Sequence, residues 1–372
     1  MTDPSIRETA PQKLEDLRSR IDDIDERLLS LLNERARIAA EVGACKRASQ
    51  PDAPFHAPGR ERQVLARLEA LNTGPFPREA IRAVFQEIMS ACLSLERPLR
   101  VAFLGPEGAF SHQAVKHQFG LSAHPVPHRS ISAVFHAVEA GQADYGVVPV
   151  ENATEGVVDP TLDAFLDSTL RVVAEILLPL ELALLTHHDV ELPGVLRVYA
   201  HSESLRHAQG WLSAHLPRAA HVVASSAMEA ARLAREDSEG AAVAPDVVAK
   251  LFDLRVAAES VQDASTDATR FWVLGQKAST PTGHDRTSMV VSVKDSPGVL
   301  LRVLEPLARR GINLTRIESR PARRRAWEYA FFLDLDGHER DELVAAALVE
   351  IERESARLKL LGSYPKAEPI RR

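Results

Sequence analysis

The spacing of apolar residues near the N-terminus constrains the fold of this chain most strongly. Apolar residues recur at alternating intervals of three and four, at Leu14, Leu17, Ile21, Ile24, Leu28 and Leu31. This spacing places them on one face of a single long amphipathic helix, which Pro11 suits at its start and Pro51 ends. Shorter helical patterns follow from Arg60 and from Pro77. The sequence therefore predicts an all-α domain over residues 8–98.

Charged residues fall within the apolar face of this helix. The register places Arg35 there, where a desolvated cation needs an anion, either a structural partner or a bound ligand. Lys46 returns to almost the same face about 16 Å further along the axis, whereas Arg18 lies about 42 Å from Lys46. Arg18 and Lys46 on one helix cannot touch the same small ligand. Either Arg18 is solvated or a second protomer supplies it, and the second alternative predicts a homodimer or higher homo-oligomer.

The pattern of apolar residues in the sequence changes after Pro98. Short β-branched runs alternate with helical stretches, and the predicted strands cover residues 101–104, 145–150, 170–176, 181–185, 198–200, 222–224 and 241–244. This alternation predicts largely parallel sheets with helices on both faces, arranged as two lobes with a cleft between them over residues 100–277. A polar loop then runs into the apolar residues Phe271 to Leu274, which places Thr269 at the mouth of a buried strand.

Composition excludes several classes of function. The net charge of -7 and the absence of a basic tail argue against a nucleic-acid partner. No apolar run is long enough to span a membrane, and the polar N-terminus has no apolar signal region. Two cysteines cannot build a disulfide framework, so we expect a cytoplasmic protein. The histidines lack partners at metal-ligand spacing and no G-x-G-x-x-G is present, so we expect neither metal nor cofactor.

The C-terminal segment follows a linker at residues 278–283. Over residues 286–365 the pattern reads strand, helix, strand, strand, helix, strand, which is the ferredoxin-like α+β order. Gly298 lies at the start of the first of these helices, where a glycine allows close approach of a carboxylate to free backbone N–H groups.

Five segments of the middle region carry a resemblance to the prephenate dehydratase family. They occur in the family's order, at Gly105 to Ser111, Pro149 to Gly156, Tyr199 to His201, Ser225 to Ala227 and Thr269 to Phe271. The resemblance implies a two-lobed α/β fold like type II periplasmic binding proteins, with prephenate between the lobes. It implies a catalytic role for Thr269. Cleft-lining or orienting roles follow for Ser111, Glu151, Asn152, His201 and Arg270.

Residues 12–97 resemble the all-helical chorismate mutases. Residue by residue, the resemblance assigns substrate binding to Arg18, Arg35, Lys46, Arg60, Glu61 and Glu96, with Arg18 supplied by the partner chain. The rearrangement of chorismate needs no covalent intermediate, so arginines that grip the carboxylates and donors that face the breaking ether oxygen suffice. We assign catalysis to Arg35, Lys46 and Glu96, the last two as donors.

Residues 286–365 resemble an ACT domain. Two segments match those through which dehydratases of this type bind phenylalanine, and their candidate residues are Gly298, Val299, Leu300, Leu301, Glu318, Ser319, Arg320 and Pro321. Together the three parts resemble a bifunctional chorismate mutase/prephenate dehydratase. This implies conversion of chorismate to prephenate and then to phenylpyruvate, with L-phenylalanine as allosteric inhibitor.

Several hydroxyl-bearing or amide residues of the dehydratase family are absent from this chain. Ala109 and Ala153 stand where threonine and serine are usual, and Asp267 stands where asparagine is usual. Two alternatives therefore stay open: a non-catalytic regulatory protein that binds aromatic metabolites, and a mutase whose dehydratase activity is weakened. The presence of Thr269 favours the bifunctional enzyme.

Overall fold

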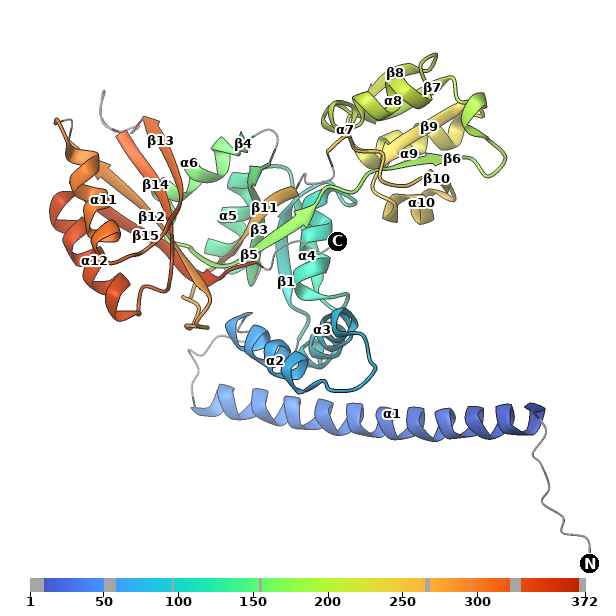
Figure 1. The fold of residues 1–372 in the computed structure, drawn as a ribbon, viewed down its shortest axis with the longest axis horizontal. Helices are drawn as coiled ribbons and strands as arrows, with labels where there is room; N and C mark the ends of the chain where they lie inside the picture. The colour runs from blue at the N-terminus through green and yellow to red at the C-terminus, as the bar shows by residue number, and fades with distance from the viewer. Residues whose placement is uncertain are drawn as a thin grey trace, which may run out of the picture.

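The structure is a computed structural model that describes residues 10–49, 58–95, 97–153, 156–264, 268–294, 296–321 and 329–367. Along the chain, three helices precede a two-lobed α/β region, and a four-stranded sheet with two helices follows (Figure 1). The all-α, α/β and α+β parts predicted from the sequence are therefore present in the predicted order.

The helical part consists of α1 (Ala10–Ser49), α2 (Pro58–Leu71) and α3 (Arg78–Ser94). Helix α1 lies along the outside of the molecule, and α2 and α3 lie between it and the α/β region (Figure 1). The apolar stripe of α1 is largely uncovered, with exposed fractions from 43% at Leu17 to 61% at Leu31. None of the described helices combines the length and the apolar character needed to cross a membrane.

The first lobe is built on a mixed sheet with the strand order β2-β1-β3-β11-β5, with β4 beside β3. Strand β1 is parallel to β2 and β3, whereas β11 is antiparallel to β3 and β5. The strands are β1 (Arg100–Leu104), β2 (His124–His128), β3 (Tyr145–Asn152), β4 (Gly156–Val157), β5 (Arg171–Pro179) and β11 (Ala268–Gly275). Helices α4 (Phe110–Phe119), α5 (Ile131–Glu139) and α6 (Asp159–Asp167) belong to this lobe.

The second lobe has the strand order β10-β6-β9-β7-β8. Its strands are β6 (Ala183–Thr186), β7 (Arg197–His201), β8 (Ala220–Ala224), β9 (Gly240–Ala244) and β10 (Arg255–Ala258). Its helices are α7 (Ser202–His207), α8 (Gln209–His215), α9 (Ala227–Glu236) and α10 (Val247–Phe252), with a short 3-10 turn at Leu192–Gly194. The chain enters this lobe after β5 and returns before β11.

The expectation of largely parallel sheets is wrong, because each lobe contains antiparallel pairs. In the first lobe β11 runs against both of its neighbours, and in the second lobe β6 runs against β9 and β10. The reason lies in the path of the chain. Strand β5 carries the chain out of the first lobe, and β11 brings it back in the opposite direction beside β5.

The C-terminal part has the predicted strand–helix–strand–strand–helix–strand order. Its elements are β12 (Asp285–Val293), α11 (Val299–Arg309), β13 (Leu314–Pro321), β14 (Tyr329–Asp336), α12 (Glu342–Glu354) and β15 (Arg357–Pro365). The antiparallel sheet has the order β13-β14-β12-β15. This order identifies the ferredoxin-like fold.

One face of the C-terminal sheet packs against its own helices and the other packs against the first lobe. Phe332, Leu361 and Tyr364 join a single buried cluster with Trp272 and Leu274 of β11. Strand β15 lies so close to β5 that a Cβ atom on Gly362 would be 2.1 Å from the Val172 carbonyl oxygen. The C-terminal sheet is therefore packed directly onto the sheet that carries Thr269.

Candidate active site

Three of the predicted polar segments meet at one edge of the first sheet. The loop from Gly105 follows β1, Asn152 ends β3, and Thr269 lies at the start of β11. Because β11 is antiparallel to β3, its first residues lie beside the last residues of β3, and Thr269 faces Asn152 in the register. This is also the edge at which the chain passes to and from the second lobe.

Thr269 and Asn152 are joined by a hydrogen bond. The Asn152 Nδ2 donates to Thr269 Oγ1 at 3.0 Å. Asn152 is buried and Thr269 is partly buried. An amide nitrogen only donates, so the Thr269 oxygen is the acceptor and its own hydroxyl proton remains available to a different acceptor. The pair can thus donate a hydrogen bond to a ligand at the sheet edge.

The loop after β1 is held by a histidine. The Gly108 N–H donates to His112 Nδ1 at 3.0 Å, and the imidazole stacks on Phe103 with 5.0 Å between ring centres. Burial, together with the charge of Lys116, lowers the pKa of His112. The lowered pKa favours the neutral ring, whose unprotonated Nδ1 is the acceptor that the loop requires.

The same loop contacts the second lobe. Gly108 has a φ of +79°, and a Cβ atom there would be 2.7 Å from Met228 Sδ of the second lobe. Ser111 follows in the first turn of α4 and is buried. His201 ends β7 in the second lobe, is partly exposed, and its Nδ1 lies 4.0 Å from Glu203 Oε2. The structure thus divides the predicted dehydratase residues between the two lobes.

Arg270 and Glu151 lie on the opposite face of the sheet from Thr269 and Asn152. Alternation along β11 turns Arg270 toward the C-terminal sheet. The pairing of β11 with β3 is irregular at this point. Arg270 pairs with Glu151 and Phe271 pairs with Pro149, so Val150 has no partner in β11. Of the cleft-lining and orienting roles predicted for these two residues, this placement favours the orienting role.

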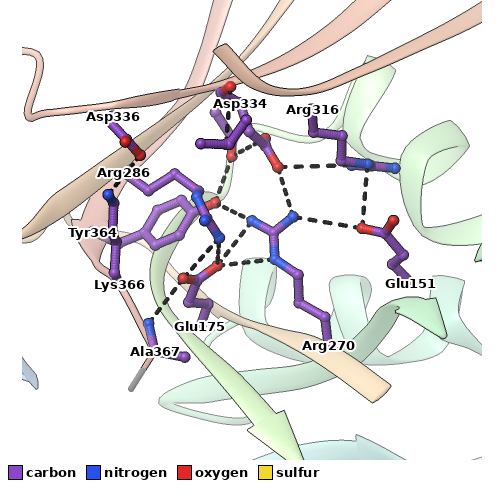
Figure 2. A network of polar contacts seen from close by, with 12 residues as sticks. Glu151, Glu175, Arg270, Arg286, Arg316, Asp334, Asp336, Tyr364, Lys366 and Ala367 are labelled. Atoms are coloured by element: carbon purple, nitrogen blue, oxygen red, sulfur yellow. Dashed lines mark hydrogen bonds and ion pairs between the residues drawn. The ribbon is translucent and has the colours of Figure 1, made fainter. Parts of the chain in front are cut away.

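Arg270 is the centre of a buried polar network (Figure 2). Its Nε lies 2.9 Å and its Nη2 2.8 Å from Glu175 Oε2 on β5. Glu175 also accepts from Arg286 Nη1 of β12, at 2.9 and 2.7 Å, and from the Ala367 N–H at 2.8 Å. The Glu175 side chain is 1% exposed. Buried charges of opposite sign therefore tie β11 and β5 to the C-terminal part.

The other half of the network lies on the C-terminal sheet. Arg270 Nη1 donates to Asp334 Oδ2 at 2.6 Å and Nη2 to the Tyr364 hydroxyl at 3.1 Å, while Ser288 donates to Asp334 Oδ1 at 2.5 Å. Burial alone would raise the pKa of the Asp334 carboxyl. The facing guanidinium groups of Arg270 and Arg316 outweigh it and lower that pKa. Asp334 is thus an ionised carboxylate inside the interface.

Arg316 of β13 completes the network from the edge of the C-terminal sheet (Figure 2). Its Nε lies 3.5 Å from Glu151 Oε2 and its Nη1 lies 4.0 Å from Asp334 Oδ2. The side chain is 8% exposed, and neither Nη1 nor Nη2 has a hydrogen-bond partner among the described residues. Sequence reasoning missed Arg316, Glu175 and Asp334, because nothing in the local pattern indicates that these strands meet.

The predicted mutase residues other than Glu96 lie on α1 and α2. Arg18 is exposed beside Glu15, at 3.7 Å, whereas Arg35 is partly buried and its Nη1 has no hydrogen-bond partner among the described residues. Arg60 is exposed and Glu61 is partly buried. The Lys46 side chain and the whole of Glu96 lie outside the described residues. Arg18 and Arg35 lie on one continuous helix, about 25 Å apart along its axis, so within one chain they cannot contact the same small ligand.

Glu61 lines a cavity where the three parts of the chain meet. The cavity is also lined by Arg62 and Arg82 of the helical part, His117 of α4 and Glu175 of β5. Burial, and then the charge of Arg82, lowers the pKa of His117. This cavity places the helical part directly beside the first lobe and the end of β15.

The predicted phenylalanine residues come from two elements of the C-terminal part. Gly298 adopts a left-handed φ of +75° at the start of α11, Val299 and Leu300 are partly buried, and Leu301 is 71% exposed. Glu318, Ser319, Arg320 and Pro321 lie on the edge strand β13. Arg320 Nη2 reaches Asp163 of α6 at 3.2 Å, which gives this residue a contact with the first lobe.

No group of acidic, histidine or cysteine side chains with metal-binding geometry occurs in the part of the chain that the structure describes. The polar groups at the sheet edge are hydroxyl, amide and imidazole groups. These groups suit hydrogen bonding and proton transfer to an organic ligand.

Three protein families match consecutive regions of the chain. Chorismate mutase type II matches residues 17–97, prephenate dehydratase matches residues 101–279, and the ACT domain matches residues 287–353. These regions follow the three parts of the structure in order.

Curated relatives match over almost the whole chain. The bifunctional chorismate mutase/prephenate dehydratase of Aquifex aeolicus is 45% identical, covering 96% of this chain and 99% of the relative. The protein of the same description from Stutzerimonas stutzeri is 44% identical, covering 95% and 98%. The crystal structure of the prephenate dehydratase of Arthrobacter aurescens in complex with L-Phe has a TM-score of 0.66 and 36% identity, covering 72% of this chain and 90% of that chain. The chain therefore belongs to the family of bifunctional chorismate mutase/prephenate dehydratases.

Proposed function

We propose that this chain converts chorismate to prephenate and prephenate to phenylpyruvate. A mutase domain at residues 8–98 performs the first step, a dehydratase domain at residues 100–277 the second, and an ACT domain at residues 286–365 provides regulation. The full-length match to bifunctional relatives supports both activities. The hydrogen-bonded pair of Thr269 and Asn152 at the sheet edge is the observation that carries the dehydratase assignment.

The dehydratase step breaks two bonds of prephenate. The ring carboxylate leaves as carbon dioxide, its bonding electrons enter the ring, and the ring hydroxyl leaves as water after it gains a proton. Thr269 is oriented by Asn152 so that its hydroxyl can donate toward the leaving oxygen. Ser111 and His201 are proposed to contact the substrate from the two lobes. Aromatisation drives the step, so no cofactor is needed.

The test is a pair of substitutions at one position. Thr269→Ala should abolish phenylpyruvate formation from prephenate while it leaves mutase activity intact, because the helical part is separate. Thr269→Ser retains the hydroxyl and should keep measurable dehydratase activity. If Thr269→Ala retained dehydratase activity, the assignment of Thr269 would be wrong. If the unsubstituted protein formed no phenylpyruvate but consumed chorismate, the mutase with weakened dehydratase would be the correct reading.

The mutase site is proposed to form between two chains. Arg35, Lys46, Arg60, Glu61 and Glu96 come from one chain and Arg18 from its partner. The buried Nη1 of Arg35 lacks a partner among the described residues, as expected for a group that binds a substrate carboxylate. The uncovered apolar stripe of α1 supports a homodimer in which the long helices of two chains cover one another.

L-phenylalanine is proposed to bind the ACT domain and to inhibit the dehydratase. The candidate residues are Gly298, Val299, Leu300, Leu301, Glu318, Ser319, Arg320 and Pro321. The left-handed Gly298 at the start of α11 supports the proposal, because free N–H groups there can bind the amino-acid carboxylate. We also propose a cytoplasmic location, with which the absence of a disulfide between Cys45 and Cys92 accords.

A further inference from the structure

The side chains of two adjacent residues of β11 point to opposite faces of the first sheet. Thr269 accepts from Asn152 on one face, and Arg270 donates to Asp334 on the other. Strand β3 has the same arrangement, because the register pairs Thr269 with Asn152 and Arg270 with Glu151. Thr269 and Asn152, which we call the candidate catalytic pair, each therefore have an immediate chain neighbour that faces the ACT sheet.

The ACT sheet holds both of these neighbours. Asp334 Oδ2 lies 2.6 Å from Arg270 Nη1, and Arg316 Nε lies 3.5 Å from Glu151 Oε2. Asp334 and Arg316 face one another in the register of β13 and β14. Figure 2 shows the four side chains converging from the two sheets. The ACT sheet thus contacts the two strands of the candidate catalytic pair at the level of that pair.

Because these side chains are buried, breaking the contacts between them costs free energy. The Asp334 and Arg270 side chains are 2% and 9% exposed. Removal of one partner of a buried ion pair leaves the other as an uncompensated charge, which strongly destabilises that arrangement. Consecutive Cα atoms are only about 3.8 Å apart, so a displacement of Arg270 passes to Thr269 with little attenuation. A movement of the ACT sheet must therefore disturb either the network or the candidate catalytic pair.

We propose that the ACT sheet positions the candidate catalytic pair through Arg270 and Glu151, which Asp334 and Arg316 hold from the other side. These four are positioning residues, since none of them needs to touch the substrate. The proposal rests on the role proposed above for Thr269. It also gives phenylalanine a route to the site, because Arg316 lies on β13 two residues before the predicted phenylalanine contact Glu318.

The test is Asp334→Asn in the full chain, with kcat and KM for prephenate and the mutase activity measured on the same protein. We expect about a tenfold or greater loss of dehydratase kcat, KM changed by less than about threefold, and unchanged mutase activity. The matched control is Asp163→Asn. Asp163 also pairs with an ACT arginine, Arg320, but it lies on α6 and not on β3 or β11. The control should keep kcat within about twofold.

A milder substitution covers the case in which Asp334→Asn does not fold. Ser288→Ala removes the Ser288 hydrogen bonds to Asp334 and to the Tyr364 hydroxyl and leaves every charge in place. It should lower dehydratase kcat by about threefold at constant KM. Unchanged kcat in folded Asp334→Asn, or in Ser288→Ala where Asp334→Asn does not fold, would overturn the proposal. Loss of dehydratase activity in Thr269→Ala alongside that result would leave the proposed function standing.

Discussion

Arg270 Nη1 lies 2.6 Å from Asp334 Oδ2, and this contact joins strand β11 of the dehydratase sheet to strand β14 of the ACT sheet. The residue before Arg270 is Thr269, which faces the other side of the sheet. Strand β11 therefore carries the candidate catalytic residue and, directly after it, a residue that attaches the strand to the ACT sheet.

The close approach of β15 to β5 at Gly362 predicts the effect of adding one methyl group. Gly362→Ala would place a Cβ atom 2.1 Å from the Val172 carbonyl oxygen, with the Val172 nitrogen at 2.9 Å. Backbone atoms cannot move aside as a side chain can, so the ACT sheet should separate from β5. We expect the thermal midpoint to fall by several degrees and dehydratase activity to decrease. Gly194→Ala, which meets open space, is the control and should leave both unchanged.

We expect protonation of His112 to reduce dehydratase activity at acid pH. Its pKa is lowered from 6.5 in the folded chain, so the neutral ring persists at neutral pH. As the pH falls through the lowered value, a proton occupies Nδ1 and the Gly108 N–H loses its acceptor. The stabilisation of the loop is therefore fully present above the ordinary pKa and is lost on acidification.

The measurement is the dehydratase rate against pH, corrected for uncatalysed conversion of prephenate. Activity should decline as the pH falls below 6.5, the ordinary pKa of histidine. In His112→Asn an amide oxygen can accept the same hydrogen bond without titrating, so the acid limb should flatten while the mutase profile stays the same. Superimposable dehydratase profiles for the two proteins would exclude this role of His112.

Mixed dimers test the shared mutase site. If Arg18 acts in the partner's site, each Arg18→Ala or Arg35→Ala homodimer has two defective sites. A heterodimer of the two variants has one site with both defects and one intact site. Mixing the unfolded chains and refolding them should therefore restore about a quarter of the wild-type mutase activity. No recovery, in mixtures that do form heterodimers, would mean that one chain supplies both Arg18 and Arg35 to its own site.

Arg316 should govern the response to phenylalanine. Arg316→Gln removes the charge that faces Glu151 and Asp334, and its buried Nη atoms have no hydrogen bonds to lose among the described residues. We expect the phenylalanine concentration for half-inhibition to rise by about tenfold, with the uninhibited rate changed less. Arg309→Gln, at an exposed residue of α11 that pairs with Glu350 of α12 and not with the first lobe, is the control and should keep normal inhibition. An unchanged response in Arg316→Gln would rule out this route.

Sequence patterns predicted most of the fold because the period of the apolar residues distinguishes a helix from a strand. The apolar repeat of α1 and the strand and helix order of the ACT domain are confirmed. Strand β2 was not predicted, since His124–His128 contains two prolines. An edge strand tolerates proline because one side of it forms no ladder. The directions of β5 and β11 depend on the excursion into the second lobe, which no local pattern reveals.

The candidate site was predictable only in part. The resemblance of the motifs indicated Thr269 and Asn152, and the structure brings them within hydrogen-bonding distance. The same resemblance gave Arg270 and Glu151 a cleft-lining or orienting role, but it did not indicate which face of the sheet they occupy. Strand alternation turns Arg270 toward the ACT sheet, and Glu151 pairs with it there. Packing of the ACT sheet on this face sets their partners, and such packing depends on residues more than sixty positions apart.

Strand β11 lies between β3 and β5, yet it is made from residues 268–275, after the entire second lobe has been synthesised. During translation, β5 has no neighbour in its own sheet until β11 emerges from the ribosome. The second lobe, whose strands are contiguous in sequence, can fold earlier. The first lobe should thus become resistant to proteases only in nascent chains that extend past Gly275. The second lobe, which the chain forms between β5 and β11, should become resistant earlier.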